Sequence, residues 1–135
     1  MPRLLRVLAA TILVTLTLGA THSLLAQTTA SEFYLQYHKA LMSAKKIDDI
    51  FPFVSEKTKK QMLATPADQR SMMFEMMQEM SMMSGLKVVK ETRTDTGATV
   101  TVEGVGDDKS KSTGTITLVT ENGGFKIDRE SWSTK

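Results

Sequence analysis

Methionine has the most distinctive spacing of any side chain in this sequence that could do chemistry. All ten methionines precede Gly85, and Met73, Met76, Met77 and Met80 recur at spacings of three and four residues. On a helix this spacing places the four thioethers along one side. A thioether is a soft ligand, so the pattern is compatible with binding of Cu(I) in an exported protein.

Two other interpretations of the methionine pattern are open. Flexible methionines fill irregular space in a core, where each buried side chain contributes roughly 1.5 to 3 kcal/mol. An exposed methionine surface instead suits contact with a partner or an apolar ligand. We favour core packing, and we place copper last because the chain has no cysteine. A ligand or partner surface would combine Met73, Met76, Met77 and Met80 with Phe125 and Trp132.

Residues 1–26 have the features of a secretory signal peptide. Arg3 and Arg6 supply the positive end, and the apolar stretch that follows is short for a membrane span. We expect cleavage after Ala26, with Ala20 as the second choice and an uncleaved membrane anchor as the alternative. The sequence therefore predicts export by the general secretory route, to the periplasm or the cell exterior.

The charge and cysteine content of the remaining chain exclude several classes of protein. Seventeen basic and fifteen acidic residues are present, but Arg3 and Arg6 fall within the predicted signal, so residues 27–135 carry no net charge. A nucleic-acid binder would show a basic surface, so we expect no nucleic-acid partner. The absence of cysteine excludes disulfides and thiolate ligands, so stability must come from packing. No phosphate-binding loop or dinucleotide fingerprint is present, and we expect no cofactor.

The elements that position the candidate residues change character at Gly85. Apolar residues recur every three or four positions before it, which predicts helices, and alternate after it, which predicts strands. The expected helices are 29–46, 56–64 and 66–84, with a helical turn at 48–54. A capping box of Thr29 and Glu32 starts the first helix, Ser55 caps the second, and the third ends at Gly85 in a left-handed conformation. The expected strands are 86–94, 98–105, 112–121 and 125–132, joined by short turns as an antiparallel meander.

Alternation predicts which strand residues face the helices. Ala98, Val100 and Val102 share one face of the second strand. In the last strand, Phe125 and Ile127 oppose their neighbours Lys126 and Asp128. We therefore expect one buried and one solvated face of the sheet, in a single domain over residues 27–135.

The order of elements and three local segments carry a resemblance. Ser-Glu-Lys-Thr-Lys-Lys from Ser55, Leu-Lys-Val-Val-Lys-Glu from Leu86, and Gly-Gly-Phe-Lys-Ile-Asp from Gly123 with a final Trp132 are similar to small exported domains of the nuclear transport factor two-like superfamily. The resemblance implies the α+β cystatin-like cone, in which three N-terminal helices pack on a curved four-stranded antiparallel sheet. It also implies homodimerisation through the open sheet face. The superfamily contains isomerases, dehydratases, binding modules and domains of unknown function, so it does not fix an activity.

The resemblance adds a catalytic alternative. In isomerases of this superfamily a tyrosine stabilises a developing oxyanion while a carboxylate moves the proton. Tyr34, Tyr37 and Asp48 are the candidates here, weighed against ordinary core tyrosines and a solvated helix end. His38 lies off the apolar stripe of its segment, and we expect it at the surface.

From the sequence we expect a non-catalytic exported domain that binds a small apolar ligand or an envelope protein. The alternatives are a small lyase or isomerase and a methionine-rich Cu(I)-binding protein. An enzyme needs titratable groups that converge in a pocket, whereas a binding module can have a wholly apolar one. Two or more polar side chains buried together at the floor of a cavity would count against binding alone.

Overall fold

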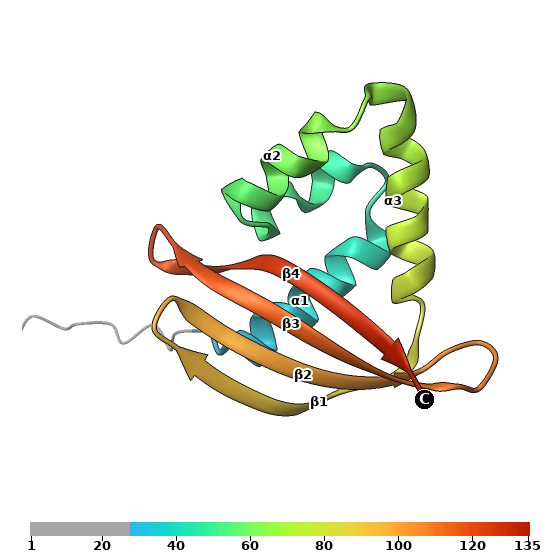
Figure 1. The fold of residues 1–135 in the computed structure, drawn as a ribbon, viewed down its shortest axis with the longest axis vertical. Helices are drawn as coiled ribbons and strands as arrows, with labels where there is room; N and C mark the ends of the chain where they lie inside the picture. Colours follow the sequence, from blue (N-terminus) through green and yellow to red (C-terminus); the bar gives the residue numbers. More distant parts are fainter. Residues whose placement is uncertain (1–27) are drawn as a thin grey trace, which may run out of the picture.

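The protein is an α+β domain with its helices on one face of an antiparallel sheet (Figure 1). The computed structural model describes residues 28–135, and the predicted signal peptide lies outside that range. The elements are α1 (Ala30–Ser43), the 3-10 helix η1 (Ile47–Phe53), α2 (Glu56–Ala64), α3 (Ala67–Ser81), β1 (Ser84–Thr94), β2 (Gly97–Val105), β3 (Lys111–Glu121) and β4 (Gly124–Thr134). The predicted fold class is confirmed.

The four strands form an antiparallel meander in the order β1-β2-β3-β4, as the short turns predicted. The sheet twists but is not strongly curled, so the pronounced cone expected from the resemblance is absent (Figure 1). Ala98, Val100 and Val102 of β2 are fully buried against the helices, which confirms the face predicted from alternation.

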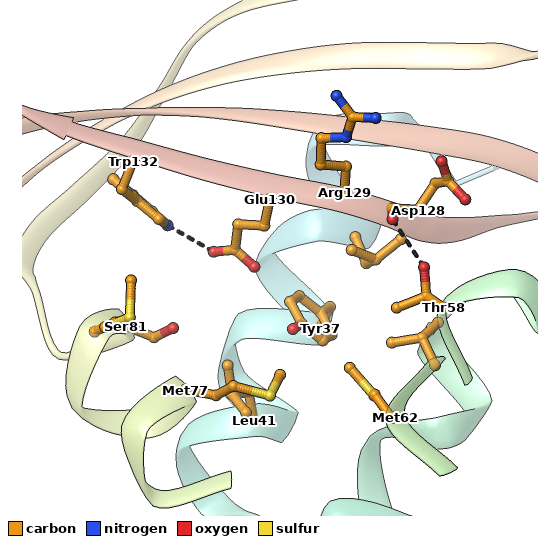
Figure 2. A pocket seen from close by; sticks show the side chains of 13 residues that line it. Tyr37, Leu41, Thr58, Met62, Met77, Ser81, Asp128, Arg129, Glu130 and Trp132 are labelled. Atoms are coloured by element: carbon orange, nitrogen blue, oxygen red, sulfur yellow. Dashed lines mark hydrogen bonds between the residues drawn. The ribbon is translucent and has the colours of Figure 1, made fainter. Parts of the chain in front are cut away.

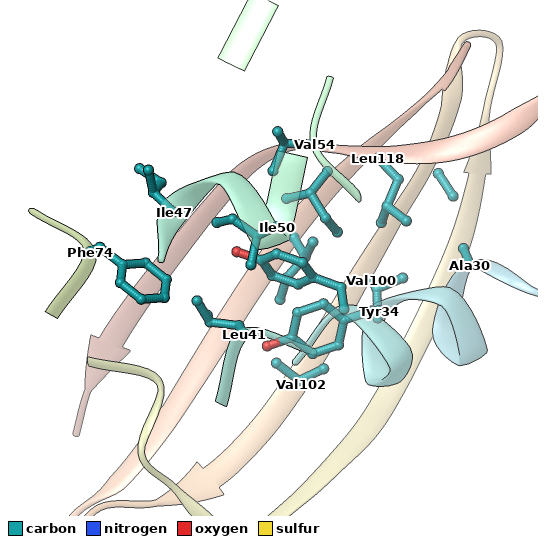
Figure 3. Packing of buried hydrophobic residues seen from close by; sticks show 14 residues of the cluster. Ala30, Tyr34, Leu41, Ile47, Ile50, Val54, Phe74, Val100, Val102 and Leu118 are labelled. Atoms are coloured by element: carbon teal, nitrogen blue, oxygen red, sulfur yellow. The ribbon is translucent and has the colours of Figure 1, made fainter. Parts of the chain in front are cut away.

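The core lies between α1 and the sheet (Figure 3). Thr29 and Glu32 form the predicted capping box at the start of α1, which fixes where this helix begins. Tyr34, Tyr37 and Leu41 then project from one side of α1 into the core. The buried apolar residues are Ala30, Tyr34, Tyr37, Leu41, Ile47, Ile50, Val54, Phe74, Ala98, Val100, Val102, Ile116, Leu118 and Ile127.

The end of α3 differs from the prediction. The helix stops at Ser81 rather than Ser84, and Met82 already has an extended backbone. Gly85 does adopt a left-handed φ of 60°, but within β1, where the register shifts between Ser84 and Lys87. Glycine is suited to this bulge because it lacks the Cβ that disfavours positive φ. Gly85 therefore shapes the start of the sheet instead of ending the helix.

His38 is partly buried, so the prediction of a surface histidine is wrong. Its Nε2 lies 2.9 Å from the carbonyl oxygen of Ser81, in the last turn of α3. A carbonyl only accepts hydrogen bonds, so Nε2 carries the hydrogen and donates it. The last carbonyls of a helix have no partner within the helix, and His38 satisfies one of them. The contact also joins α1 to α3 at the edge of the candidate site.

Candidate functional site

A β-bulge in β4 determines which side chains reach the helix side of the sheet. In β3 the adjacent residues Leu118 and Thr117 pair with Ile127 and Arg129 of β4. Asp128 lies between these two partners and has none of its own, so it is an extra residue in β4. An extra residue reverses the alternation beyond it. Glu130, opposite Ile116, therefore lies on the buried face. Regular alternation from Ile127 would have turned it outward.

The start of α2 holds this bulge in place. Ser55 caps α2 by accepting the amide hydrogen of Thr58, and its hydroxyl donates to a carboxylate oxygen of Asp128 at 2.9 Å. The hydroxyl of Thr58 donates to the main-chain carbonyl of Asp128 at 2.8 Å, and Lys57 pairs with its carboxylate at 3.6 Å. The polar segment Ser55–Lys60, noted in the sequence, thus contacts β4 and holds the extra residue Asp128 in position.

A pocket of about 230 Å³ lies between β4 and the helices (Figure 2). Its walls are mostly apolar, and Tyr37 and Glu130 are among its polar lining residues. The ring of Trp132 lies over Gly114, where a Cβ atom would approach it to 2.9 Å, so a larger residue at Gly114 would displace the indole. The lining residues are Tyr37, Leu41, Val54, Thr58, Met62, Met77, Met80, Ser81, Ile127, Asp128, Arg129, Glu130 and Trp132.

Glu130 is the polar centre of the pocket. Its Oε1 atom accepts a hydrogen bond of 2.8 Å from Trp132 Nε1 and a longer one of 3.3 Å from the Tyr34 hydroxyl. Figure 2 shows the second carboxylate oxygen turned toward Tyr37. Tyr34 is fully buried behind the pocket, whereas Tyr37 lines it. Tyr37, the Trp132 indole and the Glu130 carboxyl group therefore meet in a mostly apolar pocket, with Tyr34 buried behind them.

Burial changes the acid-base behaviour of these groups. Removal from water raises the pKa of Glu130, although hydrogen bonds from Trp132 and Tyr34 and the charge of His38 act in the opposite direction. Burial also raises the pKa of Tyr34 and of Tyr37, and the neighbouring Glu130 carboxylate raises both further. The tyrosines are therefore hydrogen-bond donors, and Glu130 is the group able to exchange a proton.

Replacing Glu130 with glutamine is expected to remove a pH-dependent loss of stability. Because its folded pKa lies above the ordinary 4.5, the carboxyl's stabilising contribution is complete below pH 4.5 and is lost as the pH rises through the raised pKa. The free energy of unfolding of the wild type, relative to Glu130→Gln, should fall over that window. Urea unfolding of both proteins across a pH series measures this difference, and a constant or rising difference would contradict the expectation.

The four methionines predicted to form one surface differ in burial along α3. Met73 and Met77 pack against the core, and the Thr65 hydroxyl donates to the Met73 sulfur. Met76 and Met80 are 54% and 60% exposed, although Met80 also borders the pocket. The four thioethers are therefore divided between packing, pocket lining and open surface.

The remaining candidates also separate. Trp132 lines the pocket, but Phe125 lies in a different hollow with Phe33 and Arg93, whose guanidinium is 4.8 Å from the Phe125 ring centre. Asp48 is outside the pocket and exposed, 4.0 Å from the Lys46 amine. Of the proposed tyrosine and carboxylate combination, the tyrosines are in place and Asp48 is not.

Glu130 was not identified from the sequence. Its neighbours Arg129 and Ser131 are polar, so it reads as part of a solvated strand end. The one available signal is the final Trp132, whose aromatic ring favours burial and whose position two residues on implies the same face. Regular alternation, however, would place Ile127 and Trp132 on opposite faces of the sheet. Only the bulge at Asp128 allows both to face inward.

The protein is thus an α+β domain with a small pocket between its helices and its sheet, and Tyr37 and Glu130 are polar residues of that pocket. Comparison of the chain with protein family models, curated proteins and solved structures finds no match. Within residues 28–135, no helix is both long enough and apolar enough to cross a membrane. The same part of the chain contains no group of three or more His, Cys, Asp or Glu residues placed to hold a metal ion.

Proposed function

We propose that the protein is an exported member of the nuclear transport factor two-like superfamily that binds a small, mostly apolar molecule in the pocket beside β4. The order of three helices followed by a four-stranded meander supports the superfamily, and the signal-like residues 1–26 support export to the periplasm or beyond. The polar part of the ligand contacts Glu130 and Tyr37, while its apolar part lies against Leu41, Met77 and Trp132.

The convergence of Glu130 and Tyr37 at the inner end of an apolar pocket carries this proposal. Ligand sites typically combine apolar walls with a few polar groups that fix orientation. The meeting of two polar side chains is also the feature that we expected to count against binding without catalysis, so proton transfer on the bound molecule is proposed beside it. The volume of about 230 Å³ lies below the range of roughly 300 to 1,000 Å³ typical of pockets for drug-sized ligands, so the ligand is small.

Proton transfer on the bound molecule is the second candidate function. The observation that favours it is the buried Glu130 carboxyl, whose raised pKa brings it nearer to neutral pH, where general acids and bases are most effective. Tyr37 would donate a hydrogen bond to the reacting oxygen. In this lyase or isomerase, Glu130 replaces Asp48 as the carboxylate. A ligand that binds equally well to wild type and Glu130→Gln, but is turned over only by the wild type, would establish catalysis.

The exposed methionines support a further, weaker proposal of contact with an envelope protein. Met72, Met76 and Met80 follow one another at intervals of four on α3, and all three are more than half exposed. Flexible thioethers suit a partner surface. The open face of the sheet, rich in threonine, is where a homodimer would form. Copper is not included in the proposal, because Met73 and Met77 pack against the core whereas Met76 and Met80 are exposed.

The small-molecule proposal is tested with n-pentanol as a probe. Trp132 is the only tryptophan in the chain and lines the pocket, so its fluorescence reports on occupancy. We expect n-pentanol to change this fluorescence saturably in the wild type, and Met77→Phe, which fills the pocket, to weaken the response strongly. Met76→Phe is the matched control, since Met76 is exposed on the same helix. Equal binding by all three proteins, or no saturable response, would refute the proposal.

A further inference from the structure

Glu130 differs from Asp128 and Glu91, two other carboxylates with partly covered side chains, in having no cationic side chain beside it. Asp128 has the Lys57 amine at 3.6 Å, and Glu91 has the Arg93 Nε atom at 3.9 Å. Among residues 28–135, no lysine, arginine or histidine nitrogen lies within 4.0 Å of the Glu130 carboxylate. The side chains that donate to it, Trp132, Tyr34 and Tyr37, are all neutral.

The other charged side chains around the pocket form no ion pair with Glu130 in the described part of the chain. Arg129 is adjacent in sequence, but its side chain projects to the opposite side of β4 (Figure 2). His38 on α1 contributes some positive charge toward Glu130, yet its Nε2 hydrogen is donated to Ser81. Asp128 is acidic and satisfied by Ser55 and Lys57. A carboxylate in so apolar a site lacks a counter-charge, and the pocket leaves room for one to enter.

The walls of the pocket suit an organic cation. Trp132 and Tyr37 present aromatic side chains, and a cation over an aromatic face is stabilised by the ring quadrupole. Met62, Met77 and Met80 add polarisable thioethers along the rest of the wall. A hydrated inorganic cation would gain little from such a lining, whereas an alkylated ammonium ion presents both charge and apolar surface.

We propose that the ligand of this pocket is a small organic cation of the alkylammonium class. Its nitrogen donates to the carboxylate oxygen of Glu130 that faces Tyr37, and its alkyl chain lies between Met77 and Trp132. The inference rests on the proposed function, because it requires that the pocket bind a small molecule. A carboxylic acid of the same length would place a second negative charge beside Glu130, and an alcohol would leave that charge uncompensated.

Three probes of equal chain length test the inference: n-pentylammonium, n-pentanol and pentanoate. Each is titrated against the wild type at neutral pH, with Trp132 fluorescence as the readout. Both probes can donate a hydrogen bond to Glu130, but only n-pentylammonium adds an opposite charge, so it should bind about tenfold or more tightly than n-pentanol. Pentanoate should bind most weakly. In Glu130→Gln, the advantage of n-pentylammonium over n-pentanol should disappear.

The outcomes distinguish the inference from the function on which it rests. If n-pentanol or pentanoate binds the wild type as tightly as n-pentylammonium, the pocket binds small molecules but the cation inference is wrong. If none of the three binds, both fail. The comparison within the wild type decides the matter even if Glu130→Gln does not fold. A preference for n-pentylammonium that persists in a folded Glu130→Gln protein would also overturn the assignment of Glu130.

Discussion

Leu41→Ala is expected to lower the free energy of unfolding by about 2 to 5 kcal/mol. Leu41 is 1% exposed and lies where the core meets the pocket, so truncation removes contacts on both sides. The cost combines the lost burial of the side chain with the cavity it leaves, because close-packed neighbours relax only partly. The same change enlarges the pocket, which should alter the affinity for n-pentanol. Urea unfolding measures the first effect and Trp132 fluorescence the second.

Leu35→Ala provides the control on the same helix. Leu35 is 43% exposed on α1, so its truncation leaves no enclosed cavity. The loss of stability should be well under half of that for Leu41→Ala, with no change in probe binding. Equal losses in the two variants would mean that α1 does not bury the face assigned to it.

Ser55→Ala is expected to lower the free energy of unfolding by about 2 to 4 kcal/mol, the combined effect of a lost helix cap and a lost hydrogen bond to a charged group. Ser55 is 1% exposed, and it caps α2 while donating to Asp128. The change leaves the Thr58 amide and one Asp128 oxygen without this partner. Because the Asp128 bulge positions Glu130 and Trp132, the fluorescence of folded Ser55→Ala should also differ from that of the wild type.

Ser43→Ala is the matched serine control. The Ser43 hydroxyl is exposed and returns only to carbonyl groups of its own helix, at Lys39 and Ala40. Its replacement should change stability by no more than about 0.5 kcal/mol and leave the Trp132 emission unchanged. A Ser55→Ala protein as stable as Ser43→Ala, with native emission, would show that the contact between α2 and β4 does not fix the bulge.

Much of the architecture was predictable because its signals are local. The capping box at Thr29, the cap at Ser55 and the alternation of Ala98, Val100 and Val102 all involve residues close in sequence, and the structure reproduces each. Helix ends were less predictable. At the end of α3, the Ser81 carbonyl accepts a hydrogen bond from His38, a residue 43 positions earlier.

The candidate site could be predicted only in part for the same reason. Tyr34 and Tyr37 were recognised as titratable residues on a helix, but their carboxylate partner was sought nearby in sequence, at Asp48. The structure instead brings Glu130 to Tyr34 from 96 residues away. Polar side chains follow no periodic pattern that would indicate such a pairing, so composition and spacing pointed to Asp48, an acid that lies outside the pocket.

The sequence by itself determined the fold class, the order and approximate limits of the elements, and the buried face of the second strand, because side-chain period and capping act over a few residues. Only the tertiary structure decided the composition of the pocket. One extra residue in β4, held by Ser55 across 73 positions, turns Glu130 inward. Which face of the sheet a side chain occupies depends on the register of its strand with the partner strand. Contacts between segments distant in sequence set that register.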